Sequence, residues 1–229
     1  MSAIQPEDKP DQAQREVAHI SEEKEQQRQR LITINRRDST PVLVDLVKAG
    51  FEIVRISDLY NKKYNYKTAI PVLLRWLPQI ENMDVKEDIV RALSVSWAKP
   101  VAAPVLIDEF RKIQNESSTG IKWAIANALS VVANDRVFAD IVDLAQGPKH
   151  GTARQMLAVS LGNMKDSSAQ DVLINLLDDD EVAGHAIMGL GKLKSKKAHQ
   201  AIERFLNHPK TWVRNEAKKA LAKIDKAGK

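Results

Sequence analysis

The feature that most constrains the fold is a repeat of about 30 residues that begins near Thr68. Each unit contains a leucine at the same place, and successive leucines are 36, 32, 29 and 31 residues apart: Leu93, Leu129, Leu161, Leu190 and Leu221. Apolar or small residues recur eight, four and one positions before each leucine, as Val85, Ile89 and Ala92 do in the first unit. These offsets share one face of an α-helix, and small residues on that face allow a neighbouring helix to approach closely.

A second apolar segment precedes each of these helices. The five segments read PVLLRWL, PVLIDEF, DIVDLA, DVLINLL and AIERFL. Each unit is therefore predicted to be a helical hairpin, and because one hairpin cannot bury its own apolar face, the units are expected to stack. The predicted fold is all-α: a right-handed α-solenoid (an α-α superhelix) of about five hairpins with an N-terminal helical cap.

The second helices resemble those of HEAT-like repeats. The segments that carry this resemblance are VRNEAKKALAKI (213–224), ARQMLAVSLGNM (153–164) and GHAIMGLGKL (184–193). The short period is similar to that of the bacterial type named after phycobilisome lyases, and the resemblance covers roughly residues 68–225. It implies the solenoid fold, whereas proteins with such repeats include scaffolds, regulators, lyase subunits and DNA-repair enzymes.

The chain is predicted to have three parts. Residues 1–38 form a charged leader that is helical or partly disordered, and residues 39–67 form capping helices. Residues 68–229 form the HEAT-like array, with units at about 68–100, 101–136, 137–168, 169–197 and 198–229. The run Asp38-Ser39-Thr40-Pro41 is typical of a helix start and Gly50 of a helix end. A further helix is predicted from Phe51 to about Lys62.

Composition and missing motifs exclude several classes of protein. The chain has no cysteine, which excludes a disulfide scaffold, thiolate metal sites and cysteine catalysis. No HExxH motif, His-Glu dipeptide, phosphate-binding loop or nucleophile elbow is present. We therefore expect a protein that is not an enzyme, with no catalytic, cofactor-binding or metal-binding residues.

The N-terminal region lacks the apolar segment of a secretory signal, and no run of about 18 apolar residues occurs. No membrane partner is therefore expected, and the expected location is the cytoplasm.

The outward face of the second helices is predicted to form a binding groove. Positions six, five and two before each leucine should point away from the core, on the concave side of the solenoid. In the middle units the candidate groove residues are Trp123, Asn127, Gln155, Met156, Val159, His185 and Met188. An apolar centre ringed by polar residues is typical of a site for a protein or peptide partner. Two alternatives stay open: a helical phase shifted by one residue, or a leader that folds over these side chains.

Positive charge gathers at the C-terminal end. Residues 182–229 contain 12 Lys/Arg and 3 Asp/Glu, which gives +9, whereas the whole chain has a formal charge of +5. The candidate basic patch comprises Lys192, Lys194, Lys196, Lys197, Lys218, Lys219 and Lys223. Such a patch can attract nucleic acid or acidic proteins. The alternative is a solvated terminal cap that keeps the last repeat soluble.

A basic residue follows the small apolar residue at the start of the second helix in four units: Lys86, Lys122, Arg154 and Arg214. We expect each to pair with an acidic residue in an adjacent unit, and Ala183 is the exception in the fourth unit.

Three functions are compatible with these patterns. The first is a non-enzymatic scaffold or adaptor that binds a protein or peptide in the groove. The second is nucleic-acid binding through the basic C-terminal repeats, as in HEAT-like DNA glycosylases, whose aromatic and acidic constellation Trp123 and Asp88 match only in part. The third is a phycobilin-lyase-like or chaperone subunit, which the name of the repeat suggests.

Overall fold

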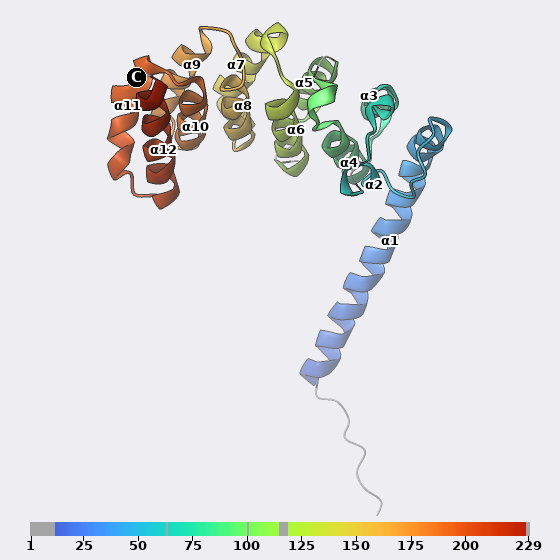
Figure 1. Cartoon of the computed structure of the whole chain (residues 1–229). Helices are drawn as coiled ribbons and strands as arrows, with labels where there is room; N and C mark the ends of the chain where they lie inside the picture. The colour runs from blue at the N-terminus through green and yellow to red at the C-terminus, as the bar shows by residue number, and fades with distance from the viewer. Residues whose placement is uncertain (1–11, 63, 100, 115–118, 228–229) are drawn as a thin grey trace, which may run out of the picture.

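The computed structural model describes residues 12–62, 64–99, 101–114 and 119–227. This part of the chain contains helices and no strand. Successive helical hairpins form an arch, and a long N-terminal helix projects from one end of it (Figure 1). The predicted all-α solenoid is confirmed.

The first helices of the five hairpins form the outer layer of the arch (Figure 1). They are α3 (Ile70–Trp76), α5 (Ala102–Lys112), α7 (Phe138–Gln146), α9 (Ala169–Asn175) and α11 (His199–Glu203). Short 3-10 turns extend or precede them: η1 (Lys67–Ala69), η2 (Leu77–Gln79), η3 (Ser96–Ala98), η5 (Asp135–Val137), η7 (Leu176–Asp178), η8 (Lys196–Ala198) and η9 (Arg204–Asn207).

The second helices form the inner layer. They are α4 (Met83–Leu93), α6 (Thr119–Val132), α8 (Ala153–Leu161), α10 (Ala183–Leu193) and α12 (Thr211–Ala227), with η6 (Pro148–His150) before α8. Each packs against the next in chain order. The concave side of the arch is therefore lined by second helices (Figure 1).

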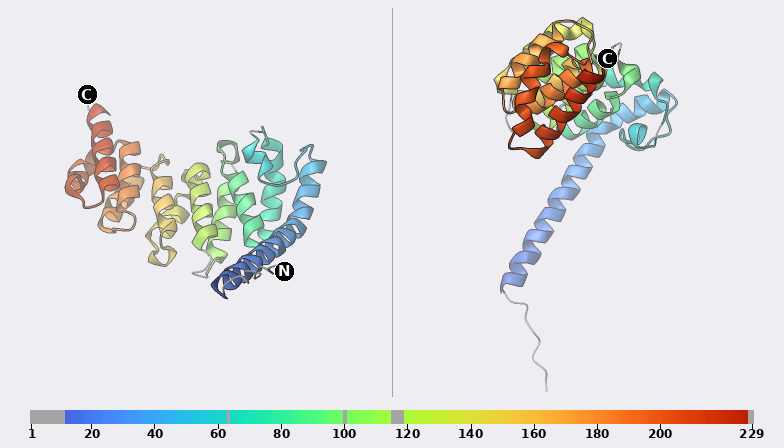
Figure 2. Two further views of the ribbon diagram at one scale, coloured as in Figure 1. Left: turned by 90° about the horizontal axis from the view of Figure 1, so that it is seen from below. Right: turned by 60° about the vertical axis from the view of Figure 1, so that its left-hand side comes forward.

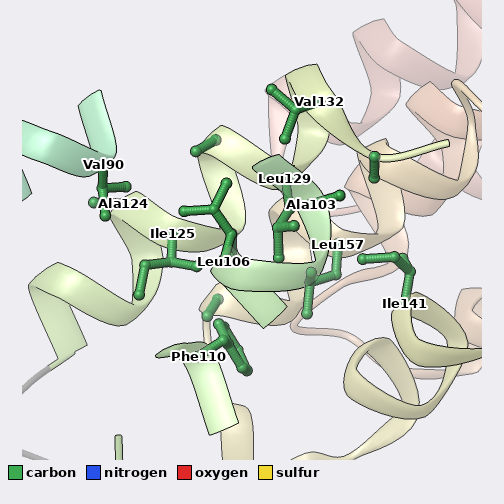
Figure 3. Packing of buried hydrophobic residues seen from close by; sticks show 14 of the residues in the cluster. Val90, Ala103, Leu106, Phe110, Ala124, Ile125, Leu129, Val132, Ile141 and Leu157 are labelled. Carbon is green, nitrogen blue, oxygen red and sulfur yellow. The ribbon is translucent and has the colours of Figure 1, made fainter. Parts of the chain in front are cut away.

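The predicted core face is confirmed in every unit. The leucine and the residues one, four and eight positions before it are buried in all five second helices. Figure 3 shows the packing around the second hairpin, where Leu106 and Phe110 of α5 lie beside Ile125 and Leu129 of α6. The residues at these offsets thus share one helical face, and that face packs against the outer layer. The alternative of a helical phase shifted by one residue is therefore excluded.

Small residues let the inner helices approach closely, as expected for Gly189, one position before the repeat leucine, and also at Gly191, one position after it. A Cβ added to Gly191 of α10 would lie 2.7 Å from the Cβ and 2.8 Å from the Cα of Ala220 in α12. A Cβ on Gly189 would lie 3.1 Å from the carbonyl oxygen of Ala158 in α8. Glycine at these positions therefore sets the spacing between α10 and both of its neighbours.

The predicted helix start at residues 38–41 is wrong, because α1 (Gln12–Lys48) runs through these residues without interruption. The polar side chains here form hydrogen bonds within the helix instead of capping its start. The hydroxyls of Ser39 and Thr40 donate to the carbonyl of Arg36 at 3.1 and 2.8 Å. Pro41 lies inside the helix, where it lacks an N–H to donate and crowds the preceding turn. The helix changes direction along its length (Figure 2), and an internal proline is the ordinary cause of such a bend.

The predicted end of this helix at Gly50 is confirmed, since α1 ends at Lys48 and Gly50 has a φ of +94°. The predicted helix from Phe51 to Lys62 is wrong over most of its length, because α2 covers Asp58–Asn61 alone. The carboxylate of Asp58 accepts hydrogen bonds from the backbone N–H groups of Val54 and Arg55, at 3.0 and 3.2 Å. These local bonds stabilise a turn that competes with a helix.

The C-terminal part of α1 packs on the first hairpin. Leu46 is fully buried, and the carboxylate of Asp45 accepts from Arg75 at 2.7 Å and from the indole of Trp76 at 3.0 Å. The amide of Asn82, which caps α4, donates to Asn35 at 2.8 Å and to Asp38 at 3.0 Å. Residues on both sides of position 38 therefore contact the array.

Candidate functional site

The seven predicted groove residues lie on three adjacent inner helices: Trp123 and Asn127 on α6, Gln155, Met156 and Val159 on α8, and His185 and Met188 on α10. None of them is buried. Because the three helices pack side by side and these residues share offsets from the buried leucines, they lie on the same side of the inner layer, which we call the inner face. The N-terminal part of α1 projects away from the arch (Figure 1), and Trp123 and Met188 are exposed.

Two apolar side chains are prominent on the inner face. Trp123 is 40% exposed and Met188 is 39% exposed, although Ile125 and Leu190, which lie on the same helices, are fully buried. Between them on α8, Met156 packs against the core while part of its side chain reaches the surface. The inner face is therefore apolar at its centre and is built on a tightly packed support.

The position of Gln155 is set by a bond between units. Its side-chain amide donates to the backbone carbonyl of Glu181 at 3.0 Å, just before α10. Asn163 makes a similar link on the other side of α8, where its amide donates to the carbonyl of Ser130 at 2.6 Å. Polar side chains at the borders of α8 thus hold it in register with α6 and α10.

His185 contributes a mainly apolar surface. Its ring lies 5.3 Å from that of Trp212, and its buried Nδ1 has no hydrogen-bond partner among the described residues. Burial lowers the pKa of His185, and the nearby carboxylate of Glu216 offsets part of this shift. The imidazole is therefore neutral near pH 7.

Trp212 extends the inner face onto α12. From the sequence it is interpreted as a packing residue at the start of the last helix, and its ring does lie over Gly184, where a Cβ would collide with it. It is also exposed and stands beside His185, so it belongs to the surface that the sequence analysis assigned to three helices. The signal that could have indicated this is Gly184, which stands at an outward offset in the unit that lacks the basic residue.

Asp88 does not join Trp123 in an acidic and aromatic constellation. The hydroxyl of Tyr60 in α2 donates to its carboxylate at 2.8 Å. Burial raises the pKa of Asp88, and the hydrogen bond from Tyr60 opposes this shift. The carboxylate thus joins the first repeat to the N-terminal cap.

The four basic residues at the start of the second helices have different partners. Two pair with an acidic residue of the next unit: Lys86 with Glu109 at 2.5 Å, and Arg154 with Asp179. Lys122 instead donates to the carbonyl of Ile113 at 3.0 Å.

Arg214, in the last unit, donates to the carbonyls of His208 and Pro209 at 2.6 and 2.9 Å. The expectation of an acidic partner is therefore confirmed at Lys86 and Arg154 and wrong at Lys122 and Arg214. A carbonyl can take the place of the acid because its oxygen also accepts hydrogen bonds from an ammonium or guanidinium, although without the opposite charge.

The seven lysines of the candidate basic patch are all exposed. Lys197 pairs with Asp171 at 2.5 Å and Lys219 with Glu216 at 2.7 Å. Lys192 lies in the last turn of α10, and Lys194 follows it in a left-handed conformation with φ 54°. Positive charge at the C-terminal end of a helix is stabilised by the helix dipole, which gives part of this cluster a structural role.

The acidic run before α10 is also used in ion pairs. Asp178 pairs with Arg204 at 2.6 Å, and Asp179 pairs with Arg154. Among the described residues, no group of three or more His, Cys, Asp or Glu side chains is arranged to hold a metal ion. In the same part of the chain, no helix combines the length and the apolar character that crossing a bilayer requires.

The fold and this inner face define the class of α-solenoid repeat proteins. Comparison with protein families gives the particular type: residues 173–229 match the model of HEAT repeats, and residues 153–179 match the PBS lyase HEAT-like repeat. These two matches, which together span residues 153–229, support a HEAT-like repeat protein. No curated protein matches it. HEAT repeats generally mediate interactions between proteins.

Proposed function

We propose that this protein is a non-enzymatic scaffold or adaptor that binds a peptide or protein segment on the inner face of α6, α8 and α10. The observation that carries the proposal is the exposure of Trp123 and Met188 on a face that is otherwise closely packed. Tryptophan is enriched among the residues that dominate binding energy at protein interfaces. Methionine adapts its shape to an irregular apolar partner.

The support beneath the inner face favours tight binding. The side chains of Ile125, Leu157 and Ala186, on α6, α8 and α10, are fully buried, so the helices that carry the contact residues are held in place before a partner arrives. A preorganised surface loses little conformational entropy on binding. The amides of Asn127 and Gln155 beside the apolar centre can bond to a peptide backbone and orient it.

Nucleic-acid binding through the basic patch is the alternative. Paired acids offset the charge of Lys197 and Lys219, and helix ends account for Lys192 and Lys194. Five of the seven lysines have no acidic partner among the described residues, so the test below includes a nuclease arm. A phycobilin-lyase-like or chaperone role has the match of residues 153–179 as its support.

The test is affinity capture from the source lysate with three forms of the full chain, each with and without nuclease. The forms are wild type, Trp123→Glu and Val54→Glu, a control in which the charge enters an exposed loop between α1 and α2. We expect a protein that survives nuclease, is captured by wild type and Val54→Glu, and is lost with Trp123→Glu. Capture that is lost on nuclease treatment and is unchanged by Trp123→Glu would contradict the proposal and favour nucleic-acid binding.

A further inference from the structure

The N-terminal part of α1 is a helix without a partner in the arch. We call residues 12–34 the α1 extension, which projects from the end of the array in Figure 1 and in the right-hand view of Figure 2. All of its described side chains are exposed, including Val17, Ile20, Leu31 and Ile34. With Ile32, five large apolar side chains of the α1 extension are therefore exposed to water.

Contacts within the α1 extension give it little support. Glu25 accepts from Arg28 at 3.2 Å and from Gln29 at 2.7 Å, and His19 lies 3.6 Å from Glu23. Exposed pairs of this kind contribute a few tenths of a kcal/mol each. Most helical stability in proteins comes from packing of an apolar face, so a partner for this face is expected.

Four of these five apolar residues, all except Ile32, follow a heptad pattern. Positions 17, 24 and 31 are separated by seven residues, as are 20, 27 and 34, and the two series alternate at spacings of three and four. Val17, Ile20, Leu31 and Ile34 occupy the two ends of this stripe, and Lys24 and Gln27 occupy its centre. This spacing is that of the a and d positions of a coiled coil, here with apolar residues at both ends and polar residues at the centre.

We propose that the α1 extension pairs antiparallel with the α1 extension of a second copy of this chain. In antiparallel register Val17 meets Ile34 of the second copy, and Ile20 meets Leu31 of the second copy. Lys24 then meets Gln27 of the second copy at the centre. Apolar side chains therefore contact apolar side chains, and none of them is buried against a charged group. Two-fold symmetry repeats each contact, which is the usual form of a homodimer interface.

The charges that flank the seam fit the same register. The positions that precede Val17, Lys24, Leu31 and Asp38 are Glu16, Glu23, Arg30 and Arg37, acidic in the first half and basic in the second. Antiparallel pairing sets Glu16 against Arg37 of the second copy and Glu23 against Arg30 of the second copy. All four side chains are exposed. Arg37 follows the α1 extension and is paired with Asp38 at 2.8 Å, so it would exchange this partner for Glu16 of the second copy. Flanking charges of opposite sign select the partner and its direction.

A parallel pair fits less well. It would place Lys24 against Lys24 of the second copy in the seam, where like charges repel. Its cross-helix charged pairs would be limited to Glu23 with Arg28 of the second copy, since Glu16 would face Ser21 and Arg30 would face Asn35. Charge complementarity therefore favours a second copy in the antiparallel direction. This pairing does not involve the inner face and is independent of the proposed function.

The first test compares two neighbouring substitutions by measuring the molar mass of the full chain in solution over a range of concentrations. Leu31 is 49% exposed and lies in the seam, whereas Ile32 is 47% exposed and lies outside it. We expect a dimer, with a mass of twice 25.6 kDa, for wild type and Ile32→Glu. Leu31→Glu should raise the dissociation constant about tenfold or more, because it places a charge in both copies of one apolar layer. A wild-type monomer at all concentrations, or equal effects of the two variants, would overturn the proposal.

The second test determines direction. The chain has no cysteine, so introduced thiols report on their own neighbours alone. A mixture of Ile20→Cys and Leu31→Cys chains should form the mixed disulfide on mild oxidation, whereas Ile20→Cys by itself should not form a disulfide-linked dimer. Efficient crosslinking of Ile20→Cys with itself would demonstrate parallel pairing and contradict the register.

Charge reversal gives an independent check. Glu23→Arg alone and Arg30→Glu alone should each weaken the dimer, because each sets like charges against one another. The double variant should restore the wild-type dissociation constant. Failure of this rescue would show that Glu23 and Arg30 do not face each other across the seam.

Discussion

Lys86 and Glu109 form a buried ion pair between two successive hairpins, with Nζ and Oε2 2.5 Å apart. Lys86 lies at the start of α4, Glu109 lies in α5, and both residues are almost wholly removed from solvent. Lys112 gives Glu109 a second bond of 2.6 Å from the surface. Burial opposes ionisation of Glu109, but these two ammonium groups outweigh it and hold the pKa of the carboxyl below its ordinary value of 4.5.

This ion pair predicts an unequal response to substitution. Glu109→Ala should lower the free energy of unfolding by about 3 kcal/mol, because it leaves the ammonium of Lys86 buried without a counter-charge. The double variant Lys86→Met/Glu109→Leu should recover most of this loss, since two apolar side chains can replace a buried pair. Urea denaturation measures both. A loss below about 1 kcal/mol for Glu109→Ala would show that the pair is not buried in solution.

His150 predicts that the free energy of unfolding depends on pH. Burial lowers the pKa of His150 to about 4, and the positive charges of Lys122 and Lys149 add to this shift. The unfolded chain therefore binds more protons than the folded chain between about pH 6.5 and 4, so the free energy of unfolding should fall as the pH falls through this range.

His150→Leu should flatten that dependence, leaving a smaller part of the same sign from His185, whose pKa is also lowered by burial, and a part of opposite sign from Asp88, whose pKa burial raises. Glu109 acts in a separate window, because a carboxyl with a lowered pKa contributes fully above its ordinary value of 4.5 and loses its contribution below it. Urea denaturation at several pH values measures this. An unchanged slope in His150→Leu would contradict the assignment to His150.

The close packing of α10 on α12 predicts opposite effects for one substitution at two glycines. Gly191→Ala should destabilise the protein by about 1–3 kcal/mol, because its Cβ would press on the backbone of Ala220. Gly120→Ala adds a Cβ that meets nothing within 4 Å and should be neutral or stabilising by up to about 1 kcal/mol. Thermal unfolding of the two variants compares them directly. Equal stability of both would mean that α10 and α12 are further apart than described.

The sequence predicted the array well because burial obeys one rule in every unit. Each second helix sets a leucine and three small or apolar residues against the outer layer, so periodicity alone identified the core face, with Ile125 and Leu129 as typical members. The same rule placed Trp123 and Met188 on the opposite side. Both inferences rest on helical geometry, which does not depend on neighbours far along the chain.

The N-terminal region was harder to predict, because competing local interactions determine its structure. Pro41 is favourable at a helix start, yet α1 continues through it because Val42 and Leu46 beyond it are buried on the first hairpin. Asp58 ends the expected second helix by binding backbone N–H groups. Tertiary contact and local hydrogen bonds outweighed propensity at these positions.

The membership of the inner face depended on a contact between units. Trp212 is next to the core residue Val213 in sequence. Its ring contacts Gly184, which is far from it in sequence and lies on the neighbouring helix α10. A repeat pattern compares equivalent positions and does not show which side chain crosses to its neighbour. The acceptors of Lys122 and Arg214 could not be predicted for the same reason. Both residues donate to backbone carbonyls, which every residue type has, so the sequence does not indicate which carbonyl accepts.

The most direct test of the proposed adaptor function is site-specific photocrosslinking in the source lysate. A photoreactive amino acid would replace Trp123, Met188 or Val54 in otherwise unchanged full chains. We predict that positions 123 and 188 crosslink to the same protein and that position 54 does not. Equal crosslinking from position 54, or none from positions 123 and 188 while the partner is still captured, would contradict binding at the inner face.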